Sequence, residues 1–255
     1  MRLDKYLAEH GFSSRTKAAR ALAKGLVTVN GKPGKASDEV SDSDDICVRE
    51  EEIGFVSEGG YKLHRAFSCF GDSAEGMVFA DIGASTGGFT DCLLQAGARR
   101  VYAVDVGKSQ LDPRLAADGR VVVMDGINAR YLTREDFPEQ IDGIVADVSF
   151  ISLTLIIPAA AKILSDCKTA YLLIKPQFEC GGVGLDKHGI VKDERVRLAA
   201  VQKICLCAKG EGFALCGIVN APLQKGKNIE YILKLQKEAG GSSVEEIVRE
   251  AALPR

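Results

Sequence analysis

From residue 77 onward, the sequence alternates short apolar runs with longer amphipathic segments, and this alternation limits the chain to a few folds. The apolar runs, rich in Val, Ile and Leu, predict strands over 77–82, 100–106, 120–124, 141–146, 170–174, 213–219 and 229–235. Helices are predicted over 89–96 and 193–209. Strands that alternate with helices are typical of a doubly wound, largely parallel sheet. We therefore expect an α/β, Rossmann-like domain with an antiparallel C-terminal strand.

Charged residues lie at the ends of five predicted strands. They are Asp81, Asp105, Asp125, Asp147 and Lys175. Because a buried charge without a partner is costly, these side chains should lie at an open edge of the sheet. In doubly wound sheets, ligands bind beyond the carboxyl ends of the strands. The sequence therefore predicts a ligand site at this edge.

A glycine-rich turn follows the first of these strands and indicates which ligand binds. Its glycines, Gly83, Gly87 and Gly88, fit neither the G-x-G-x-x-G dinucleotide fingerprint nor a P-loop. The turn has no Lys or Arg, and Asp81 and Asp105 would repel phosphates. S-adenosylmethionine instead carries an ammonium, a sulfonium and ribose hydroxyls, which carboxylates can bind, while glycines let the backbone approach closely. The turn therefore favours S-adenosylmethionine.

Charge is distributed unevenly along the chain. Residues 1–35 contain eight Lys and Arg against two acids, and residues 36–52 contain eight acids and one base, although the net charge is only −2. A basic N-terminal segment of this kind indicates an anionic partner, most often nucleic acid.

The basic N-terminal segment itself has the pattern of a small α+β module. One helix is predicted near Leu3, and a second is expected to end near Lys24, before Gly25. A strand over 27–29 runs into Asn30-Gly31, a strong hairpin signal, and 45–48 is expected to be the closing strand.

Three stretches of this module resemble the S4 RNA-binding domain over residues 1 to about 50. They are Arg2–Leu7, Ser14–Ala18 and Gly25–Gly31. Lys17, Arg20 and Lys24 recur at helical spacing and share one face, where cations can meet RNA phosphates. The resemblance implies RNA binding through Arg2, Arg15, Lys17, Arg20 and Lys24.

A linker is expected after this module. Charge is dense over 51–60, and Gly59-Gly60 should break any helix. We therefore expect an S4-like domain over 1–50, a linker over 51–60 and an α/β domain over 61–255.

The segment Asp81–Thr90, which reads Asp-Ile-Gly-Ala-Ser-Thr-Gly-Gly-Phe-Thr, resembles motif I of FtsJ-type methyltransferases. Four other segments resemble the narrower TlyA-type, or hemolysin A, family. They are Gly59–Leu63, Ala146–Ser152, Leu173–Glu179 and Gly226–Tyr231. The resemblance implies S-adenosylmethionine-dependent 2′-O-methylation of ribose in ribosomal RNA, with the RNA or a ribosomal subunit as partner and no metal.

The same resemblance implies roles for individual residues. The catalytic tetrad of the FtsJ class falls on Lys62, Asp147, Lys175 and Glu230. The cofactor-binding positions, together with those of the turn, are Asp81, Gly83, Ser85, Gly87, Gly88, Phe89, Asp105 and Asp125.

The chemistry of methyl transfer assigns a task to Lys175. A ribose 2′-hydroxyl is a poor nucleophile, so the enzyme must align it with the methyl group and help to remove its proton. Lys175 is the candidate base, provided that a fraction of it is neutral. The like charge of Lys62 favours the neutral form, whereas Asp147 and Glu230 favour the cation. The balance stays open at the level of sequence.

Two other functions remain as alternatives. One is an RNA-binding ribosome-assembly factor with an inactive methyltransferase fold, although an intact tetrad and glycine turn disfavour it. The other is a membrane-lysing hemolysin. The longest apolar tract, Val148–Leu164, is interrupted by polar residues and too short to span a bilayer, and no strongly amphipathic apolar helix supports lysis.

The cysteines and the N-terminus bear on metal binding and location. The eight cysteines form no C-x-x-C pair and there are only three histidines, so no metal site is expected. Most cysteines lie in apolar stretches and are expected to be buried and reduced. Met1–Tyr6 carries charge where a signal peptide would be apolar, and we therefore expect a cytoplasmic protein.

Overall fold

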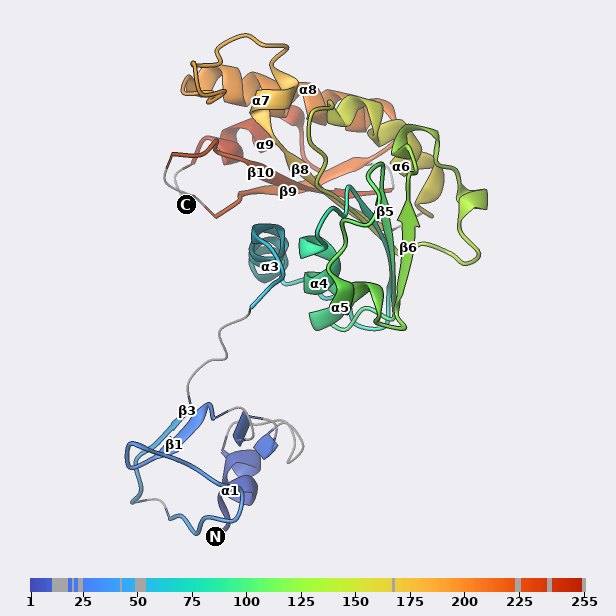
Figure 1. Ribbon diagram of the computed structural model, residues 1–255. Coiled ribbons are helices and arrows are strands. Elements are labelled where there is room, and N and C mark those ends of the chain that lie inside the picture. The colour runs from blue at the N-terminus through green and yellow to red at the C-terminus, as the bar shows by residue number, and fades with distance from the viewer. Residues whose placement is uncertain are drawn as a thin grey trace. The chain divides into compact units, whose positions relative to one another are not determined.

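The computed structural model describes residues 1–10, 18–19, 21–22, 25–41, 43–48, 54–166, 168–222, 226–237 and 240–253. The chain divides into two compact units, Met1–Gly54 and Phe55–Arg255 (Figure 1). Each unit has its own apolar core, and each is described separately below.

The first unit contains a short helix and a small antiparallel sheet. Its elements are α1 (Leu3–Glu9), β1 (Val27–Val29), β2 (Lys32–Pro33) and β3 (Ile46–Val48), with strand order β2-β1-β3. The expected hairpin forms at Asn30 and Gly31, whose φ angles of 52° and 75° suit a tight turn between two strands. Leu3 and Leu7 of α1 are buried.

Of the five expected RNA-binding residues, the structure describes Arg2. Arg15, Lys17, Arg20 and Lys24 lie outside the described residues. The side chain of Arg2 is 55% exposed and forms an ion pair with Asp4, in which its Nε lies 3.1 Å from Oδ1.

The second unit is built on a seven-stranded sheet with the order β6-β5-β4-β7-β8-β10-β9. The strands are β4 (Val78–Ile82), β5 (Arg100–Asp105), β6 (Val121–Asp125), β7 (Gly143–Ala146), β8 (Thr169–Ile174), β9 (Ala214–Asn220) and β10 (Tyr231–Gln236). Strands β4 to β8 pair in parallel, and β10 is antiparallel to both of its neighbours. The doubly wound sheet with an antiparallel C-terminal strand is thus confirmed.

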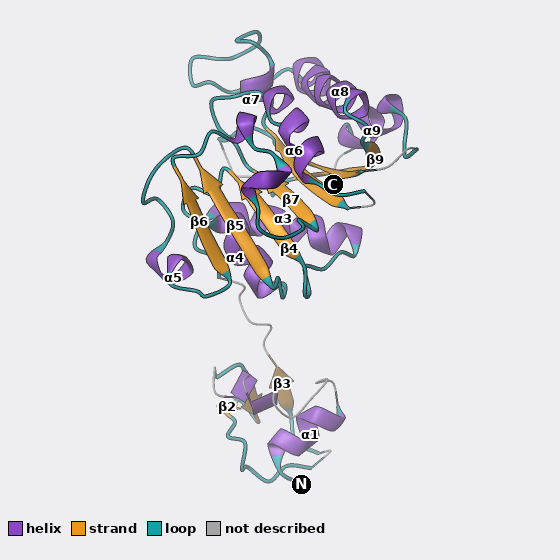
Figure 2. Cartoon of the chain, turned by 90° about the vertical axis from the view of Figure 1, so that its right-hand side faces the viewer, coloured by secondary structure: helices purple, strands orange, loops and turns teal. Residues whose placement is uncertain are grey.

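Helices cover both faces of this sheet (Figures 1 and 2). One face packs against α3 (Glu58–Phe70), α4 (Gly88–Gln95) and α5 (Pro113–Ala116). The other packs against α6 (Ile157–Ile163), α8 (Glu194–Gly210) and α9 (Val244–Ala251), with the one-turn helix α7 (Pro176–Glu179) beside α8. Short 3-10 turns are η1 (Ala129–Tyr131), η2 (Arg134–Asp136) and η3 (Leu153–Leu155). Because the strands are covered on both faces, they read as continuous apolar runs.

The expected linker is too long at its C-terminal end. Residues 55–60 belong to the second unit, where the backbone N–H of Val56 donates to Asp91 of α4 at 2.9 Å. Gly59 and Gly60 do not break a helix but lie in the first turn of α3. A Cβ on Gly60 would lie 2.3 Å from the Phe55 ring, so glycine is present because α3 packs tightly at this point.

Cysteine burial also differs from the expectation. Among the seven described cysteines, Cys92 and Cys205 are buried, whereas Cys47, Cys69 and Cys216 are exposed. Cys47 and Cys216 lie in strands, where alternate side chains face opposite sides of the sheet, so an apolar neighbourhood in sequence does not bury them. Within the described ranges, no helix is long and apolar enough to cross a membrane.

Candidate active site

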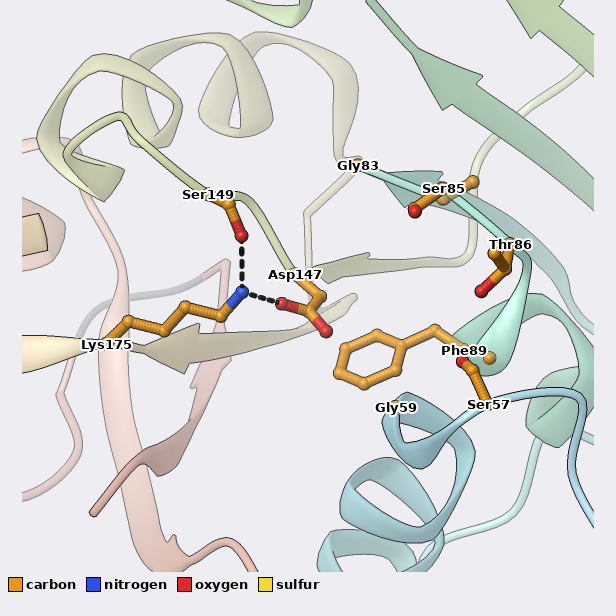
Figure 3. A pocket seen from close by; sticks show the side chains of 11 residues that line it. Ser57, Gly59, Gly83, Ser85, Thr86, Phe89, Asp147, Ser149 and Lys175 are labelled. Atoms are coloured by element: carbon orange, nitrogen blue, oxygen red, sulfur yellow. Dashed lines mark hydrogen bonds and ion pairs between the residues drawn. The ribbon is translucent and has the colours of Figure 1, made fainter. Parts of the chain in front are cut away.

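A pocket opens at the carboxyl edge of the sheet, where β4, β7 and β8 end (Figure 3). The glycine turn after β4 forms one wall, and the first residues of α3 and α4 form another. The lining residues are Ser57, Gly59, Gly83, Ala84, Ser85, Thr86, Gly88, Phe89, Asp147, Ser149 and Lys175. The predicted ligand edge therefore carries a pocket, and six of its lining residues are expected cofactor or catalytic positions: Gly83, Ser85, Gly88, Phe89, Asp147 and Lys175.

The turn needs glycines for two reasons: some of its residues have positive φ angles, and neighbouring segments leave no space for a side chain. Gly83 and Gly87 have φ angles of 83° and 95°, in the left-handed region that favours glycine. A Cβ on Gly83 would lie 2.7 Å from the backbone oxygen of Asp147, and one on Gly88 would lie 2.3 Å from Ser57 Oγ. The turn therefore allows three chain segments to meet at the pocket.

Asp81 does not lie at the open edge, contrary to the expectation for strand-end charges. It is fully buried and absent from the pocket lining. Its Oδ2 accepts a hydrogen bond from Thr90 Oγ1 at 2.6 Å, and Oδ1 has no hydrogen-bond partner among the described residues. Burial raises the pKa of Asp81 to about 7, and the nearby Asp147 and Asp105 carboxylates add to this effect. The Asp81 side chain points toward Thr90 of α4 rather than toward the rim, which explains the difference.

The raised pKa of Asp81 predicts a pH-dependent stability. The folded state binds a proton that the unfolded state, with an Asp pKa of about 3.9, releases earlier. The protonated Asp81 therefore contributes stability that is fully present below about pH 4 and is lost as the pH rises to about 7. Because Asn cannot ionise, the free energy of unfolding of Asp81→Asn, relative to that of the wild type, should rise by about 2–3 kcal/mol between pH 5 and pH 8, and its relative melting temperature should rise with it. Thermal unfolding at both pH values measures this difference, and a constant offset would contradict the assignment.

Asp105 and Asp125 lie side by side at the ends of β5 and β6. Asp105 Oδ2 accepts from the backbone N–H of Ser85 at 2.8 Å, and Oδ1 accepts from that of Gly107 at 2.7 Å. Asp125 Oδ2 accepts from the backbone N–H of Ser109 at 2.7 Å. Both side chains are partly exposed, so each carboxylate retains lone pairs for a ligand while it orders a loop.

The four residues of the expected tetrad form two ion pairs at the same edge. Lys175 Nζ lies 2.5 Å from Asp147 Oδ1 and donates to Ser149 Oγ at 2.9 Å (Figure 3). Lys62 Nζ, on α3, lies 2.6 Å from Glu230 Oε2. Antiparallel pairing of Tyr231 with Ile174 places Glu230 next to Lys175 in register. The sheet topology thus brings together residues that are far apart in sequence.

Some residues of the site were not expected from the sequence. Gln177 Nε2 donates to Glu230 Oε1 at 3.3 Å, so it contacts the second ion pair. Phe150 is 92% exposed and has a φ angle of 62°, and its ring lies 5.0 Å from that of Phe178. Since Phe is usually buried, the residue type alone did not indicate that Phe150 is exposed and packs against Phe178 beside Lys175.

The fold and the site together define a Rossmann-like methyltransferase domain, in which a glycine turn and an acidic strand end adjoin a Lys–Asp pair. Residues 55–237 match the FtsJ-like methyltransferase family, and residues 1–46 match the S4 domain. The chain belongs to the FtsJ-like methyltransferase family. This membership confirms the expected enzyme class, with S-adenosylmethionine as its methyl donor, and the expected S4 domain.

Individual relatives cover nearly the whole chain. Hemolysin A of Brachyspira hyodysenteriae is 43% identical over 240 residues, which cover 91% of this chain and 98% of the relative. The 16S/23S rRNA (cytidine-2′-O)-methyltransferase TlyA of Mycobacterium tuberculosis is 38% identical over 241 residues, 93% of this chain and 90% of the relative. A solved structure from Streptococcus thermophilus that carries the hemolysin name has a TM-score of 0.72 at 39% identity, and the match covers 98% of this chain and 95% of that one. The TlyA-type resemblance is therefore confirmed.

Proposed function

We propose that this protein transfers a methyl group from S-adenosylmethionine to a ribose 2′-hydroxyl of ribosomal RNA. The observation that carries the proposal is the position of Lys175, whose Nζ lies between Asp147 and Ser149 in the wall of the pocket. The rRNA substrate of the TlyA relative supports the choice of RNA. Since ribosomes occupy the cytoplasm, we also propose that the protein acts there.

The residues of the pocket fit S-adenosylmethionine. Gly83 and Gly88 leave the turn without side chains, and no Lys or Arg lies in it to bind a phosphate. Asp105, which is held by Ser85 of the same turn, offers a carboxylate to the ribose hydroxyls, and Asp125 lies beside it for the adenine end. When bound there, S-adenosylmethionine supplies an electrophilic methyl group.

In this proposal Nζ of Lys175 is the group that accepts the proton of the 2′-hydroxyl as the oxygen attacks. Asp147 then stabilises the ammonium that forms, since its Oδ1 lies 2.5 Å from Nζ. Ser149 fixes the direction of the Lys175 side chain through its hydroxyl. Lys62 and Glu230 form the second pair and position the ribose, and alignment supplies a large part of the rate.

The surroundings of Lys175 suit a nucleotide taken out of a helix. The exposed Phe150 packs against the half-buried Phe178, and Lys175 Nζ lies 5.9 Å from the centre of the Phe178 ring. RNA-binding proteins commonly stack unpaired bases on such rings. We therefore propose that the target base rests on this pair, while the S4 domain binds RNA elsewhere through its basic residues.

The proposed cofactor site predicts the effect of Asp105→Ala. Two ribose hydroxyls would lose a charged acceptor worth about 1.5–3 kcal/mol, and the Ser85 and Gly107 N–H groups would lose theirs. Isothermal calorimetry should show S-adenosylmethionine binding weakened at least about tenfold in a protein that still melts cooperatively. Unchanged affinity would remove Asp105 from the site.

The proposed RNA-binding face predicts a change in salt dependence. Replacing Lys17, Arg20 and Lys24 together with Gln should lower the slope of log K for RNA binding against log salt by about two to three. S-adenosylmethionine affinity should stay the same, because the cofactor pocket lies in the other unit.

A matched control uses three cations at the opposite edge of the sheet. Arg100 is the first residue of β5, Arg99 directly precedes it, and Lys168 directly precedes β8. Replacing these three with Gln changes the net charge equally and should leave the slope nearly unchanged. If both triple variants behave alike, binding follows overall charge and the S4 face has no special role.

The function itself is tested by methyl transfer to ribosomal RNA. Purified protein and labelled S-adenosylmethionine are incubated with free ribosomal RNA and with isolated small and large subunits, and 2′-O-methylated positions are then mapped. We expect label on ribose at one or a few sites, and labelling about 10²- to 10⁴-fold slower with the Lys175→Ala variant. A protein that binds both RNA and cofactor but transfers nothing would instead support the assembly-factor function.

A further inference from the structure

A buried carboxylate lies one helical turn after Lys175 and takes no part in the chemistry above. Glu179 is the last residue of α7, and its side chain is 1% exposed. Among the described residues, the other buried polar or charged ones are Asp81 and Thr90. Because a buried carboxylate is costly unless its oxygens are paired, its contacts indicate why it is present.

Glu179 joins three separate segments of the chain. Its Oε1 accepts from the backbone N–H of Leu153 at 2.7 Å. Its Oε2 accepts from Ser152 Oγ at 2.5 Å and from Lys203 Nζ at 3.1 Å. Lys203, on α8, also donates to the backbone oxygen of Glu179 at 3.0 Å. The loop after β7, the helix after β8 and α8 are therefore held together at one carboxylate.

The first two of these segments are the ones that carry the reacting groups. The loop after β7 starts at Asp147, and its Ser152 donates a hydrogen bond to Glu179. The segment after β8 starts at Lys175 and ends at Glu179. The Lys175–Asp147 ion pair crosses between the same two segments. A change in their separation at Glu179 would therefore change the position of Lys175 relative to Asp147.

The loop after β7 also has a strained residue that needs support. Phe150 has a φ angle of 62°, which is unfavourable for a side chain of this size, and it is 92% exposed. Such conformations persist only where the surrounding structure holds them. The bonds from Ser152 and Leu153 to Glu179 lie two and three positions further along the same loop.

We propose that Glu179, with Lys203, is a positioning residue that sets the separation between Asp147 and Lys175 and holds Phe150 in place. The proposal rests on the proposed methyl transfer for its effect on rate, but not for its effect on the geometry of Lys175. Glu179 itself touches neither substrate nor cofactor in this scheme.

The test compares Glu179→Gln with Asp72→Asn in the full-length protein. Asp72 is a matched control, because it also forms an ion pair within the second unit, with Lys234 Nζ at 2.7 Å, and it lies outside the pocket. Single-turnover rates are measured with saturating RNA and cofactor, alongside both dissociation constants and the melting temperature. Glu179→Gln should lower the rate by about 10- to 100-fold, as misplacement by about an ångström does, with both dissociation constants nearly unchanged. Asp72→Asn should lower only the melting temperature.

A second readout reports on Lys175 without requiring any activity. Acylation of lysines followed by mass spectrometry measures how accessible each amine is. The Lys175 side chain is 11% exposed and paired with Asp147, so it should be labelled slowly in the wild type. In Glu179→Gln its labelling should increase relative to that of Lys62, and in Asp72→Asn it should not. This result would support the positioning role even if ribosomal RNA proved not to be the substrate.

Rescue separates positioning from a simple loss of charge. Glu179→Gln leaves an amide facing the Lys203 ammonium, whereas adding Lys203→Met removes that mismatch and leaves the amide oxygen free to accept from Leu153. The double variant should therefore be faster than Glu179→Gln by at least about threefold, since coupled neighbours are not additive. Normal rate and normal Lys175 labelling in Glu179→Gln would overturn the proposal, because Glu179 would then only stabilise the fold.

Discussion

Replacing Lys175 with alanine should lower the single-turnover rate of methyl transfer by about 10²- to 10⁴-fold, the usual contribution of a positioned general base. Binding of S-adenosylmethionine and of RNA should change little, because the pocket and the S4 domain keep their other contacts. Asp147 and Ser149, which contact Lys175 Nζ in the wild type, would both remain but would lose the amine that they bind.

The Lys175→Arg variant distinguishes a base from an electrostatic clamp. Arg keeps the positive charge near Asp147 but does not lose its proton at neutral pH, so it should be almost as inactive as alanine. Lys234→Ala is the control, because it removes a lysine that is paired with a carboxylate away from the pocket. If Lys175→Arg keeps a near-normal rate, Lys175 only positions the hydroxyl, and the proton must go to Asp147, Glu230 or water.

Substituting Gly83 with alanine should lower the rate of methyl transfer by at least about 10²-fold, since small displacements of reacting groups have effects of this size. The added Cβ would lie 2.7 Å from the backbone oxygen of Asp147, so the end of β7 would have to move. Alanine would also have to adopt a φ angle of 83°, which costs about 1–2 kcal/mol. Since Gly83 lines the pocket, cofactor binding should weaken as well.

Gly212 provides a matched control for Gly83. Its φ angle is 84°, and nothing lies within 4 Å of an added Cβ. Gly212→Ala therefore imposes the same backbone strain without the collision, and it should lower the melting temperature while the rate stays normal. Equal losses of rate in the two variants would mean that strain alone, rather than the contact with Asp147, disturbs the site.

The strands and the ligand edge could be predicted because they depend on local patterns. An apolar run such as 100–106 can bury both of its faces only inside a covered sheet, and β5 forms there over Arg100–Asp105. The hairpin at Asn30-Gly31 likewise follows from two residues that tolerate positive φ angles. The sequence did not predict helix α3, because two consecutive glycines usually indicate a break in a helix. Gly59 and Gly60 are explained only by their close contacts with Phe89 and Phe55 in the folded chain.

The position of each charge at the edge depended on contacts with distant residues. Asp81 and Asp105 both end a strand, yet Asp81 is buried against Thr90, whereas Asp105 stays partly exposed and holds the turn. Lys62 and Glu230 are separated by 168 positions, and without a family resemblance nothing local pairs them. Antiparallel pairing of β10 with β8 brings Glu230 beside Lys175.

The sequence by itself therefore determined the class of fold, the edge of the sheet where the pocket lies and the residue types present there. These follow from backbone hydrogen bonding, apolar periodicity and the cost of burying charge, which act over a few neighbouring residues. Only the tertiary structure decided which charges pair, that Asp81 is buried, that Phe150 is exposed beside Phe178, and that Glu179 joins the two segments of the site. Those outcomes depend on the packing of elements far apart in the chain, and no local pattern records that packing.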